Sequence, residues 1–304
     1  MKLIVPDYYP RFQCIADRCK HSCCIGWEID IDENSLARYA AIDGALGQRL
    51  QDEIDRSGDA PHFRLAEGER CPFLNESGLC DLITELGQDS LCQICADHPR
   101  FRNEFPGHTE MGLGLCCEAA AELILTKPDP VMLITLTEDG VDDAPDDEEW
   151  YLSSVRDNAM AIVQDRAFTV AERIDNLSDF YGFVLPEQTP SKWAEFYLEL
   201  ERLDEHWTEL LTALKSDFTA TVSPEQETAW EQLLVYFIYR HLPAALIDGD
   251  ISSKLKFAVL SVTMLQWLQA ATGEPLHELA RMYSSEIEYS DENLDILFDE
   301  LYEE

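Results

Sequence analysis

Residues 12–27 read FQCIADRCKHSCCIGW, and this stretch decides how the rest of the chain is interpreted. It holds four cysteines, Cys14, Cys19, Cys23 and Cys24, within eleven positions of one another. Thiolates gathered this closely suit soft metal ions, above all zinc or the iron of iron–sulfur clusters. The stretch therefore predicts a fold in which loop-borne cysteines bind a metal and organise the chain around it.

The remaining cysteines extend this pattern without reaching the second half of the chain. They are Cys71, Cys80, Cys92, Cys95, Cys116 and Cys117. Cys71-Pro72 and Ser77-Gly78 are turn-like sequences, which suits ligands carried on loops. We predict a mainly α protein with two domains. Residues 1–128 form a cysteine-rich metal-binding domain of loops and short helices, and residues 129–304 form an all-helical domain.

A disulfide scaffold and reduced core cysteines are the competing interpretations of the thiols. Residues 1–7 are no signal peptide, because the apolar run is short and Asp7 follows it. No stretch approaches the ~18 apolar residues of a membrane span. We therefore expect a cytoplasmic protein without a membrane partner, in which thiols stay reduced unless a metal holds them.

The net charge of −38 limits the partners that the protein can have. A nucleic-acid binder needs a basic face, and 22 Lys and Arg residues against 60 Asp and Glu residues offer little material for one. An acidic surface favours basic partners or a lysine-bearing substrate, while solubility alone is the plainer interpretation.

Hydrophobic periodicity predicts the elements of both domains. The predicted helices are 32–55, 116–127, a stripe from Trp193 to Leu214, a helix opened by 223–226 and continuing to Leu242, a buried helix over 255–271, and two last helices over 274–284 and 290–302. Residues 131–137 are predicted as a strand and 142–149 as an acidic linker.

The order of the cysteine motifs resembles a known family, the flagellin lysine-N-methylases of the FliB type. The resemblance rests on Phe12-x-Cys14-x4-Cys19-x3-Cys23-Cys24-x2-Trp27, Cys71-Pro72-Phe73-Leu74, Leu79-Cys80, Leu91-x3-Cys95-x3-Pro99-Arg100, Cys116 with Glu118-Ala119-Ala120, and the closing motif Tyr283-Ser284-x-Glu286-Ile287-Glu288. These motifs also relate the chain to a broader group of zinc- or iron-chelating CxxCxxCC domains.

The resemblance implies lysine N-methylation of flagellin, with S-adenosylmethionine as the methyl donor and an iron–sulfur cluster in the protein. The eight cysteines that match its blocks are the predicted metal ligands: Cys14, Cys19, Cys23, Cys24, Cys71, Cys80, Cys95 and Cys116. One [4Fe–4S] cluster needs three or four of them. Zinc is the alternative. Zinc sites often use Cys-x-x-Cys pairs, and the sequence contains only one such pair, Cys92 and Cys95, which favours iron–sulfur over zinc.

Three positions depart from the family pattern. Cys92 and Cys117 are additional cysteines, and Tyr289 stands where a histidine is frequent. Each additional cysteine lies close in sequence to a better-placed thiol. We therefore predict that neither Cys92 nor Cys117 is a metal ligand.

The catalytic residues are not identified by any motif. Arg100 could clamp the carboxylate of the methyl donor, and a structural arginine is the alternative. A lysine ammonium could be received by an aromatic or acidic pocket, for which the candidates near the first cysteines are Tyr8, Tyr9, Trp27, Glu28 and Asp30. The competing and simpler interpretation is that Trp27 packs on the metal-binding loop and that Glu28 is solvated.

The mode of methyl transfer also stays open. The chain has no G-x-G turn of the Rossmann-type methyltransferases, nor the cysteine spacing of radical S-adenosylmethionine enzymes. Both polar and radical transfer remain as alternatives. So do two other functions: a non-catalytic metal protein with a structural or redox-sensing role, and an electron-transfer module.

Overall fold

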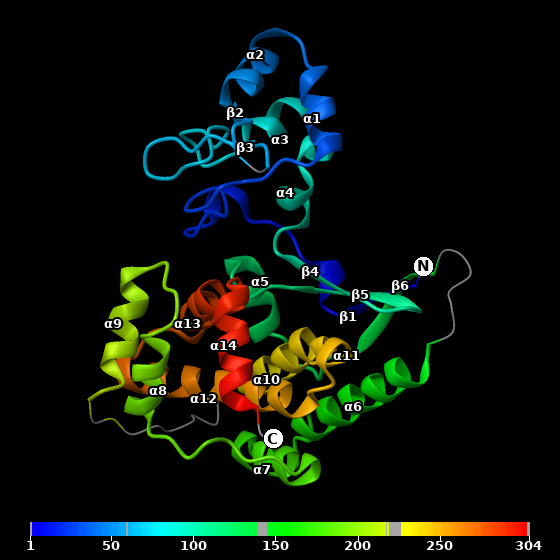
Figure 1. The fold of residues 1–304 in the computed structure, drawn as a ribbon, viewed down its shortest axis with the longest axis vertical. Helices are drawn as coiled ribbons and strands as arrows, with labels where there is room; N and C mark the ends of the chain where they lie inside the picture. The colour runs from blue at the N-terminus through cyan, green and yellow to red at the C-terminus, as the bar shows by residue number, and fades with distance from the viewer. Residues whose placement is uncertain (1, 59, 139–144, 217, 219–225, 303–304) are drawn as a thin grey trace. The chain divides into compact units, whose positions relative to one another are not determined.

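The computed structural model describes residues 2–58, 60–138, 145–216, 218 and 226–302. These residues form two compact units (Figure 1). Unit 1 comprises residues 1–12 and 101–304, and unit 2 comprises residues 13–100. The chain thus leaves unit 1, forms unit 2 and returns. This division differs from the predicted boundary at residue 128, because the first residues and the segment after residue 100 share one sheet and one core.

Unit 2 is built from short elements joined by long loops. Its helices and strands are α1 (Glu33–Ala40), α2 (Gly44–Glu53), β2 (Ile54–Asp55), β3 (His62–Phe63), α3 (Asp81–Leu86) and α4 (Gln93–Asp97). The predicted helix over 32–55 is wrong in one respect, since it is two helices. Asp32 caps the first through a bond from the Ser35 backbone N–H (2.9 Å), and the second starts at Gly44 with φ +83°. A positive φ suits glycine and breaks a continuous helix.

The sheet of unit 1 was not predicted from the sequence, apart from one strand. Its strands are β1 (Lys2–Pro6), β4 (Arg100–Glu104), β5 (His108–Leu113) and β6 (Leu133–Glu138), in the order β4-β5-β1-β6. β1 pairs in parallel with β5 and antiparallel with β6, with a bulge between Leu3 and Ile4. The fold is therefore mixed rather than mainly α, while the predicted strand over 131–137 is confirmed as β6.

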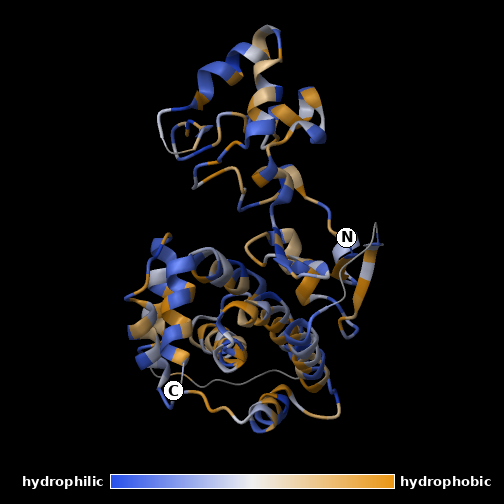
Figure 2. Cartoon of the chain, turned by 45° about the vertical axis from the view of Figure 1, so that its right-hand side comes forward, coloured by the Kyte–Doolittle hydropathy of each residue, from blue (hydrophilic) through white to orange (hydrophobic). Residues whose placement is uncertain are grey.

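The rest of unit 1 is helical, as predicted for the C-terminal region. The helices are α5 (Glu118–Leu125), α6 (Asp147–Val163), α7 (Val170–Tyr181), α8 (Pro190–Tyr197), α9 (Glu205–Ala213), α10 (Glu227–His241), α11 (Ala245–Asp248), α12 (Ile251–Thr272), α13 (Leu276–Tyr283) and α14 (Asp291–Leu301). Figure 2 shows both hydrophobic and hydrophilic residues along these helices. The predicted stripe over 193–214 is two helices, α8 and α9.

Two predicted segments lie partly outside the described residues. Residues 223–225, predicted to open a helix, lie outside the described residues, and α10 begins at Glu227. Of the predicted linker, 142–144 also lie outside them, whereas Asp147–Glu149 form the first turn of α6. Acidic residues are favoured in a first helical turn, because they face the positive end of the helix dipole.

The core of unit 1 centres on α10 and α12. Nearly every residue of α10 from Trp230 to Tyr239 is buried, and α12 is buried along most of its length, as predicted for 255–271. Tyr239 joins α10 to the sheet by donating its hydroxyl to the carbonyl oxygen of Met111 (3.1 Å). A helix that is apolar on nearly all sides is expected to lie inside a domain. No helix in the described part of the chain is long and apolar enough to cross a membrane.

Candidate functional site

Five cysteines of unit 2 lie together, and we call them the thiol cluster: Cys24, Cys71, Cys80, Cys92 and Cys95. Cys71 and Cys92 are buried in the apolar core of the unit, and the other three pack against it. Electrostatic interactions link Cys71 to Cys24, Cys80 and Cys92, and link Cys95 to Cys92, Cys24 and Cys71. The fold therefore gathers thiols that are separated by up to 71 positions in the sequence.

Local backbone structure brings the first three of these thiols together. The Cys71 backbone N–H donates to the carbonyl oxygen of Cys24 (2.8 Å). A tight loop then returns the chain from Cys71 to Cys80, with Gly78 at φ +74° and an isolated bridge pairing Leu74 with Cys80. Asn75 stabilises this loop because its side-chain oxygen accepts from two backbone N–H groups within it.

The thiols of the cluster differ in acidity. A hydrogen bond from Cys23 lowers the pKa of Cys24 to about 7, against the opposing effect of burial. Burial raises the pKa of Cys71 to about 12. A hydrogen bond from the Cys95 thiol lowers the pKa of Cys92, and that shared proton raises the pKa of Cys95. Cys24 is thus readily converted to the thiolate that metals bind.

The thiol cluster fits a soft metal in donor chemistry but is not arranged as a finished ligand set. None of the ten cysteines is in a disulfide. No three or more His, Cys, Asp or Glu side chains among the described residues stand in positions that could hold a metal ion. The donors present are those that zinc and iron–sulfur centres use.

Three predicted ligands of the first cysteine stretch are not members of the thiol cluster, although Cys23 makes a hydrogen bond with its member Cys24. Cys14 and Cys23 are exposed, and Cys14 accepts a bond from the backbone N–H of Ala16 (3.4 Å). Cys19 donates to the carbonyl oxygen of His21 (3.3 Å). Their role as ligands stays a prediction.

The last predicted ligand, Cys116, belongs to unit 1 and has different neighbours. Burial raises the pKa of its thiol to about 12, and a hydrogen bond with the Tyr289 side chain opposes this shift. Arg240 lies over the Tyr289 ring at 5.0 Å and over the Phe101 ring at 4.9 Å. Within unit 1 the thiol thus belongs to a group with a phenol and a guanidinium.

A buried ionic network holds the Arg240 guanidinium of this group in place. Arg240 pairs with Glu288 (3.3 Å), and Glu288 also accepts from Tyr236 (2.9 Å) and contacts the His241 ring nitrogen (2.6 Å). Burial by itself would raise the pKa of Glu288, but Arg240 and His241 outweigh it and hold that pKa at about 2. The carboxylate is therefore ionised and fixes the guanidinium beneath Tyr289.

A π-helical turn places Glu288 in that network. Residues Ser284–Glu288 form the turn, directly after α13 and within the closing motif quoted above. Both Glu286 and Glu288 are buried, and Glu286 accepts the backbone N–H groups of Leu203 and Asp204 (both 2.8 Å). Single π-helical turns are frequent at functional sites. The motif was identified from the sequence, but its partner Arg240 was not. The feature that could have identified Arg240 is a cationic residue in the last turn of an otherwise apolar helix.

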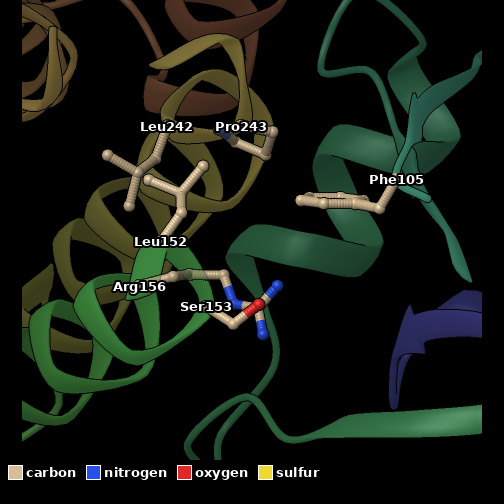
Figure 3. A pocket seen from close by; sticks show the side chains of 6 residues that line it. All are labelled: Phe105, Leu152, Ser153, Arg156, Leu242 and Pro243. Carbon is tan, nitrogen blue, oxygen red and sulfur yellow. The ribbon is translucent and has the colours of Figure 1, made fainter. Parts of the chain in front are cut away.

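A second buried ionic group ties α6 to the sheet. His108 lies between Glu149 (2.7 Å) and Glu110 (3.1 Å), and Arg156 pairs with Glu110. One oxygen of Glu110, Oε2, has no hydrogen-bond partner among the described atoms. Arg156 also lines a hollow beside Phe105 (Figure 3), which leaves no space for a water molecule. This hollow therefore has no room for a substrate.

A larger hollow of about 340 Å³ lies elsewhere in unit 1. Its lining comprises Thr189, Pro190, Ser191, Leu214, Lys215, Ser216, Phe218 and Trp267. The volume falls within the range of small-molecule pockets. None of its residues was predicted as a site residue.

The predicted donor-binding residue, Arg100, begins β4. Its guanidinium donates to the carbonyl oxygen of Ala96 (3.1 Å) at the end of α4. Burial, followed by the charge of Arg100, lowers the pKa of the neighbouring His98 to about 4. The bond to Ala96 gives the Arg100 guanidinium a structural role. Its predicted contact with the carboxylate of the methyl donor stays a prediction.

The proposed receiving residues for a lysine fall in both units. Trp27 donates its indole N–H to the carbonyl oxygen of Cys23 (2.8 Å), so it packs on the cysteine loop. Glu28 is exposed and lies 4.0 Å from His62. Tyr8 is buried in unit 1, where the Tyr9 hydroxyl points to the sulfur of Met111 (3.9 Å). Within unit 1, Tyr289 is a better candidate, because it is 49% exposed beside the buried network.

Comparison with known proteins agrees with the resemblance read from the motifs. Residues 174–304, all in unit 1, match the FliB lysine N-methylase C-terminal domain. This match includes Arg240, Glu288 and Tyr289. The chain is thus related to the FliB lysine N-methylase family through its C-terminal domain, which confirms the predicted resemblance there.

Three curated relatives are each 28% identical to the chain over 134 residues, or 42% of its length. Two are named lysine-N-methylase, from Salmonella typhimurium and Salmonella choleraesuis, and the match covers 33% of each. The third is a flagellar biosynthetic protein FliU from Salmonella muenchen, of which 79% is covered. The matched part of the chain thus spans about a third of the two lysine-N-methylases. No solved structure matches the chain.

Proposed function

We propose that the protein is an S-adenosylmethionine-dependent protein lysine N-methyltransferase that acts on flagellin. The observation that carries this proposal is the FliB lysine N-methylase C-terminal domain over residues 174–304. The names of the curated relatives support both the reaction and a flagellar substrate. The acidic composition is compatible with a lysine-bearing partner, because opposite charges steer association.

The chemistry requires a neutral amine. A lysine ε-ammonium has a pKa near ~10.4, so it must lose a proton before it reacts. In polar transfer, the nitrogen lone pair forms a bond to the sulfonium methyl carbon while the carbon–sulfur bond breaks, which leaves S-adenosylhomocysteine. The methylated nitrogen then carries the charge and releases a further proton to solvent. Alignment of nitrogen, carbon and sulfur is the main contribution that a protein can make to this step.

We assign the substrate-facing position in unit 1 to Tyr289. Its ring is half exposed, while its other contacts are to Arg240 and Cys116. Glu288 cannot touch a substrate, since it is buried, and acts by holding Arg240 in place. An exposed aromatic face can receive a lysine cation through a cation–π contact.

We further propose that the thiol cluster holds a metal centre, an iron–sulfur cluster first and zinc as the alternative. Cys24, Cys71, Cys80 and Cys95 are the ligands common to the predicted set and the thiol cluster. Such a centre would supply electron transfer if it contained iron, or structural stabilisation if it contained zinc. Radical transfer therefore remains an alternative to polar transfer.

The test is to incubate the metal-replete protein with S-adenosylmethionine and purified flagellin, and to measure the intact mass of flagellin. Mass gains in steps of one methyl group support the proposal. Gains that require a reductant indicate radical transfer, and gains without one indicate polar transfer. A flagellin that gains no mass under either condition contradicts the methyltransferase proposal.

A matched pair of tyrosine variants tests the assigned position. Tyr289→Phe and Tyr289→Ala should slow methylation, the alanine more, because it removes the ring. Tyr302→Phe is the control, since Tyr302 is similarly exposed (57%) and lies outside the network. Equal rates for all variants would remove Tyr289 from the substrate-facing position.

A non-catalytic metal or redox-sensing protein is the second candidate. The observation that favours it is the thiol cluster, in which Cys24 has a pKa of about 7 and suits thiol chemistry. Metal content that changes with redox state, together with no methyl transfer, would support this function over the first.

A further inference from the structure

Large aromatic side chains of α6 and of the end of α7 face the solvent instead of the core of unit 1. On α6, Trp150 is 67% exposed and Tyr151 is 57% exposed, and Phe180 on α7 is 65% exposed. We call these three residues the aromatic face. Single exposed apolar residues are ordinary, whereas a contiguous exposed group marks an interaction site.

Contacts between the two helices bring the three rings of the aromatic face together. Trp150 and Tyr151 are consecutive in α6. Val155 lies one turn after Tyr151 on the same side of α6, because residues four apart are neighbours on a helix surface. The Tyr181 hydroxyl donates to the carbonyl oxygen of Val155 (2.8 Å). The Phe180 ring packs edge-on against the Tyr181 ring, with their centroids 5.0 Å apart. The end of α7 thus carries Phe180 to the side of α6 on which Tyr151 lies.

The charged side chains next to the aromatic face are carboxylates. Asp147 lies three and four residues before the two rings of α6, so it neighbours both of them on the helix surface. Glu148 lies three residues before the second of these rings, and Asp179 directly precedes the ring of α7. All three carboxylates are exposed, and none forms an ion pair within the described ranges of the chain. Their charge is therefore open to a partner.

The basic residues of the same stretch are held by the interior of unit 1. Residues 146–181 contain nine Asp and Glu residues against three Arg and no Lys. Each of the three arginines pairs with a buried carboxylate, and the pairs are Arg156–Glu110, Arg166–Glu231 and Arg173–Glu231. The cations of this stretch are thus occupied by buried partners, while most of its carboxylates are exposed.

We propose that the aromatic face is a docking surface for a protein segment that carries several lysine or arginine side chains. Such cations bind both to aromatic rings and to carboxylates, and aromatic residues are enriched at protein interfaces. A second copy of the chain, a nucleic acid or an anionic membrane would bring like charges together at this face. The inference goes beyond the proposed function, because docking requires neither the methyl donor nor Tyr289.

The rival explanation is that the carboxylates only complement the dipole of α6. This explains Asp147 and Glu148, which lie in the first turn of that helix. It does not explain why three large rings are exposed beside them.

The test measures binding of a fluorescently labelled peptide of repeating Lys-Gly-Ser units to the full chain, by anisotropy at low salt. A peptide with glutamine in place of lysine is the control ligand. Trp150→Ala, Tyr151→Ala and Phe180→Ala should each raise the dissociation constant by about 2- to 5-fold, which corresponds to an exposed cation–π contact. The triple variant should raise it by about 10- to 100-fold. These substitutions at exposed positions should leave the fold intact, which thermal unfolding checks.

Matched variants separate the aromatic face from the net charge of the chain. Asp147→Asn combined with Glu148→Gln should weaken binding at low salt and reduce its salt dependence, because exposed charges are screened beyond ~8 Å at 0.15 M salt. Glu199→Gln combined with Glu205→Gln removes the same charge from exposed positions before and at the start of α9. Tyr302→Ala removes a ring that is 57% exposed outside the aromatic face. Both controls should leave the dissociation constant nearly unchanged.

Four results would overturn the inference. One is a wild type that does not bind the lysine peptide at low salt. Another is equal weakening in the face variants and the control variants, which would assign binding to net charge alone. Equal binding of the glutamine peptide would show that cations are not required. Self-association of the wild type that is lost in the triple variant would assign the aromatic face to a second copy of the chain. None of these results bears on the methyltransferase proposal, which the mass of flagellin tests separately.

Discussion

Unit 1 and unit 2 are stabilised in different ways. Unit 1 buries an extended set of apolar side chains around α10 and α12, and its ionic networks lie inside that core. Unit 2 has a core of ten buried residues within its described part, two of which are Cys71 and Cys92. A small core of short elements yields little net stability, and natural proteins compensate with metals or disulfides. The comparison is consistent with the proposed metal as a source of stability for unit 2, whereas unit 1 is stabilised by apolar burial.

The largest expected effect is loss of metal from unit 2. Cys71→Ala should abolish metal binding and unfold residues 13–100, because metal binding is coupled to folding. Hydrogen exchange read by mass spectrometry should show protection lost in unit 2 and kept in α10 and α12. Cys19→Ala, at a predicted ligand outside the thiol cluster, sharpens the comparison. Equal metal loss in both variants would extend the ligand set beyond the thiol cluster, and full retention in both would remove Cys71 from it.

Next in size are two matched truncations of buried phenylalanines, Phe73 in unit 2 and Phe237 in unit 1, both 0% exposed. A Phe→Ala change in a core costs about 3–5 kcal/mol. Phe237→Ala should lower the stability of unit 1 by this amount with or without metal. Phe73→Ala should leave unit 2 folded only when metal is bound. Thermal unfolding with and without a chelator measures both, and a metal-independent Phe73→Ala would contradict the proposed difference.

Glu288→Gln should destabilise unit 1 by roughly 3 kcal/mol, because loss of the carboxylate leaves Arg240 buried without a counter-charge. In the folded protein the pKa of Glu288 is lowered to about 2, from 4.5 for an unperturbed glutamate. The stability it contributes is therefore complete above pH 4.5 and is lost as the pH falls toward 2. Urea unfolding across this range should converge for wild type and variant. Glu292→Gln is the control, and a constant difference between wild type and Glu288→Gln would contradict the assignment.

The smallest expected effect comes from the cap of α1. Asp32→Ala should cost about 1 kcal/mol, because it removes the bond from the Ser35 backbone N–H. It also removes the bond from Gln93 that fixes the chain beside Cys92. The loss should thus appear in unit 2 and weaken metal affinity slightly, which a competitive chelator titration measures. Asp32→Asn keeps a capping oxygen and should be nearly neutral, and a large effect of Asn would indicate a role of the charge itself.

Local patterns predicted the elements that depend on local sequence. The apolar run of α12 and the strand β6 were predicted from their local sequence. The break between α1 and α2 was missed, although Gly44, with its positive φ, marks it. The sheet could not be found in this way, because β1 pairs with β5 across about a hundred residues and each strand is only five or six residues long. Non-local pairing leaves no periodic trace in either segment.

The site was predicted by residue type but not by arrangement. The order of the cysteines does not say which thiols meet, and the structure adds Cys92 to the thiol cluster while placing Cys116 beside Tyr289 in unit 1. Arg240 was not predicted as a site residue, because the helix that contains it is otherwise mostly buried core. Its importance follows from Glu288, which the π-helical turn brings to it from 48 positions further along the chain.

The insertion of unit 2 between residues 12 and 101 has a consequence for the energetics of the sheet. To unit 1, residues 13–100 are a single connecting loop between β1 and the strands that follow. Loop-closure entropy grows only slowly with length, by about 0.6 kcal/mol for each doubling. A folded insertion holds its two ends at a fixed separation, whereas an unfolded one behaves as a long flexible chain. Folding of unit 2 thus changes the stability of the β1–β5 pairing through chain connectivity alone, as a small entropic coupling that needs no contact between the units.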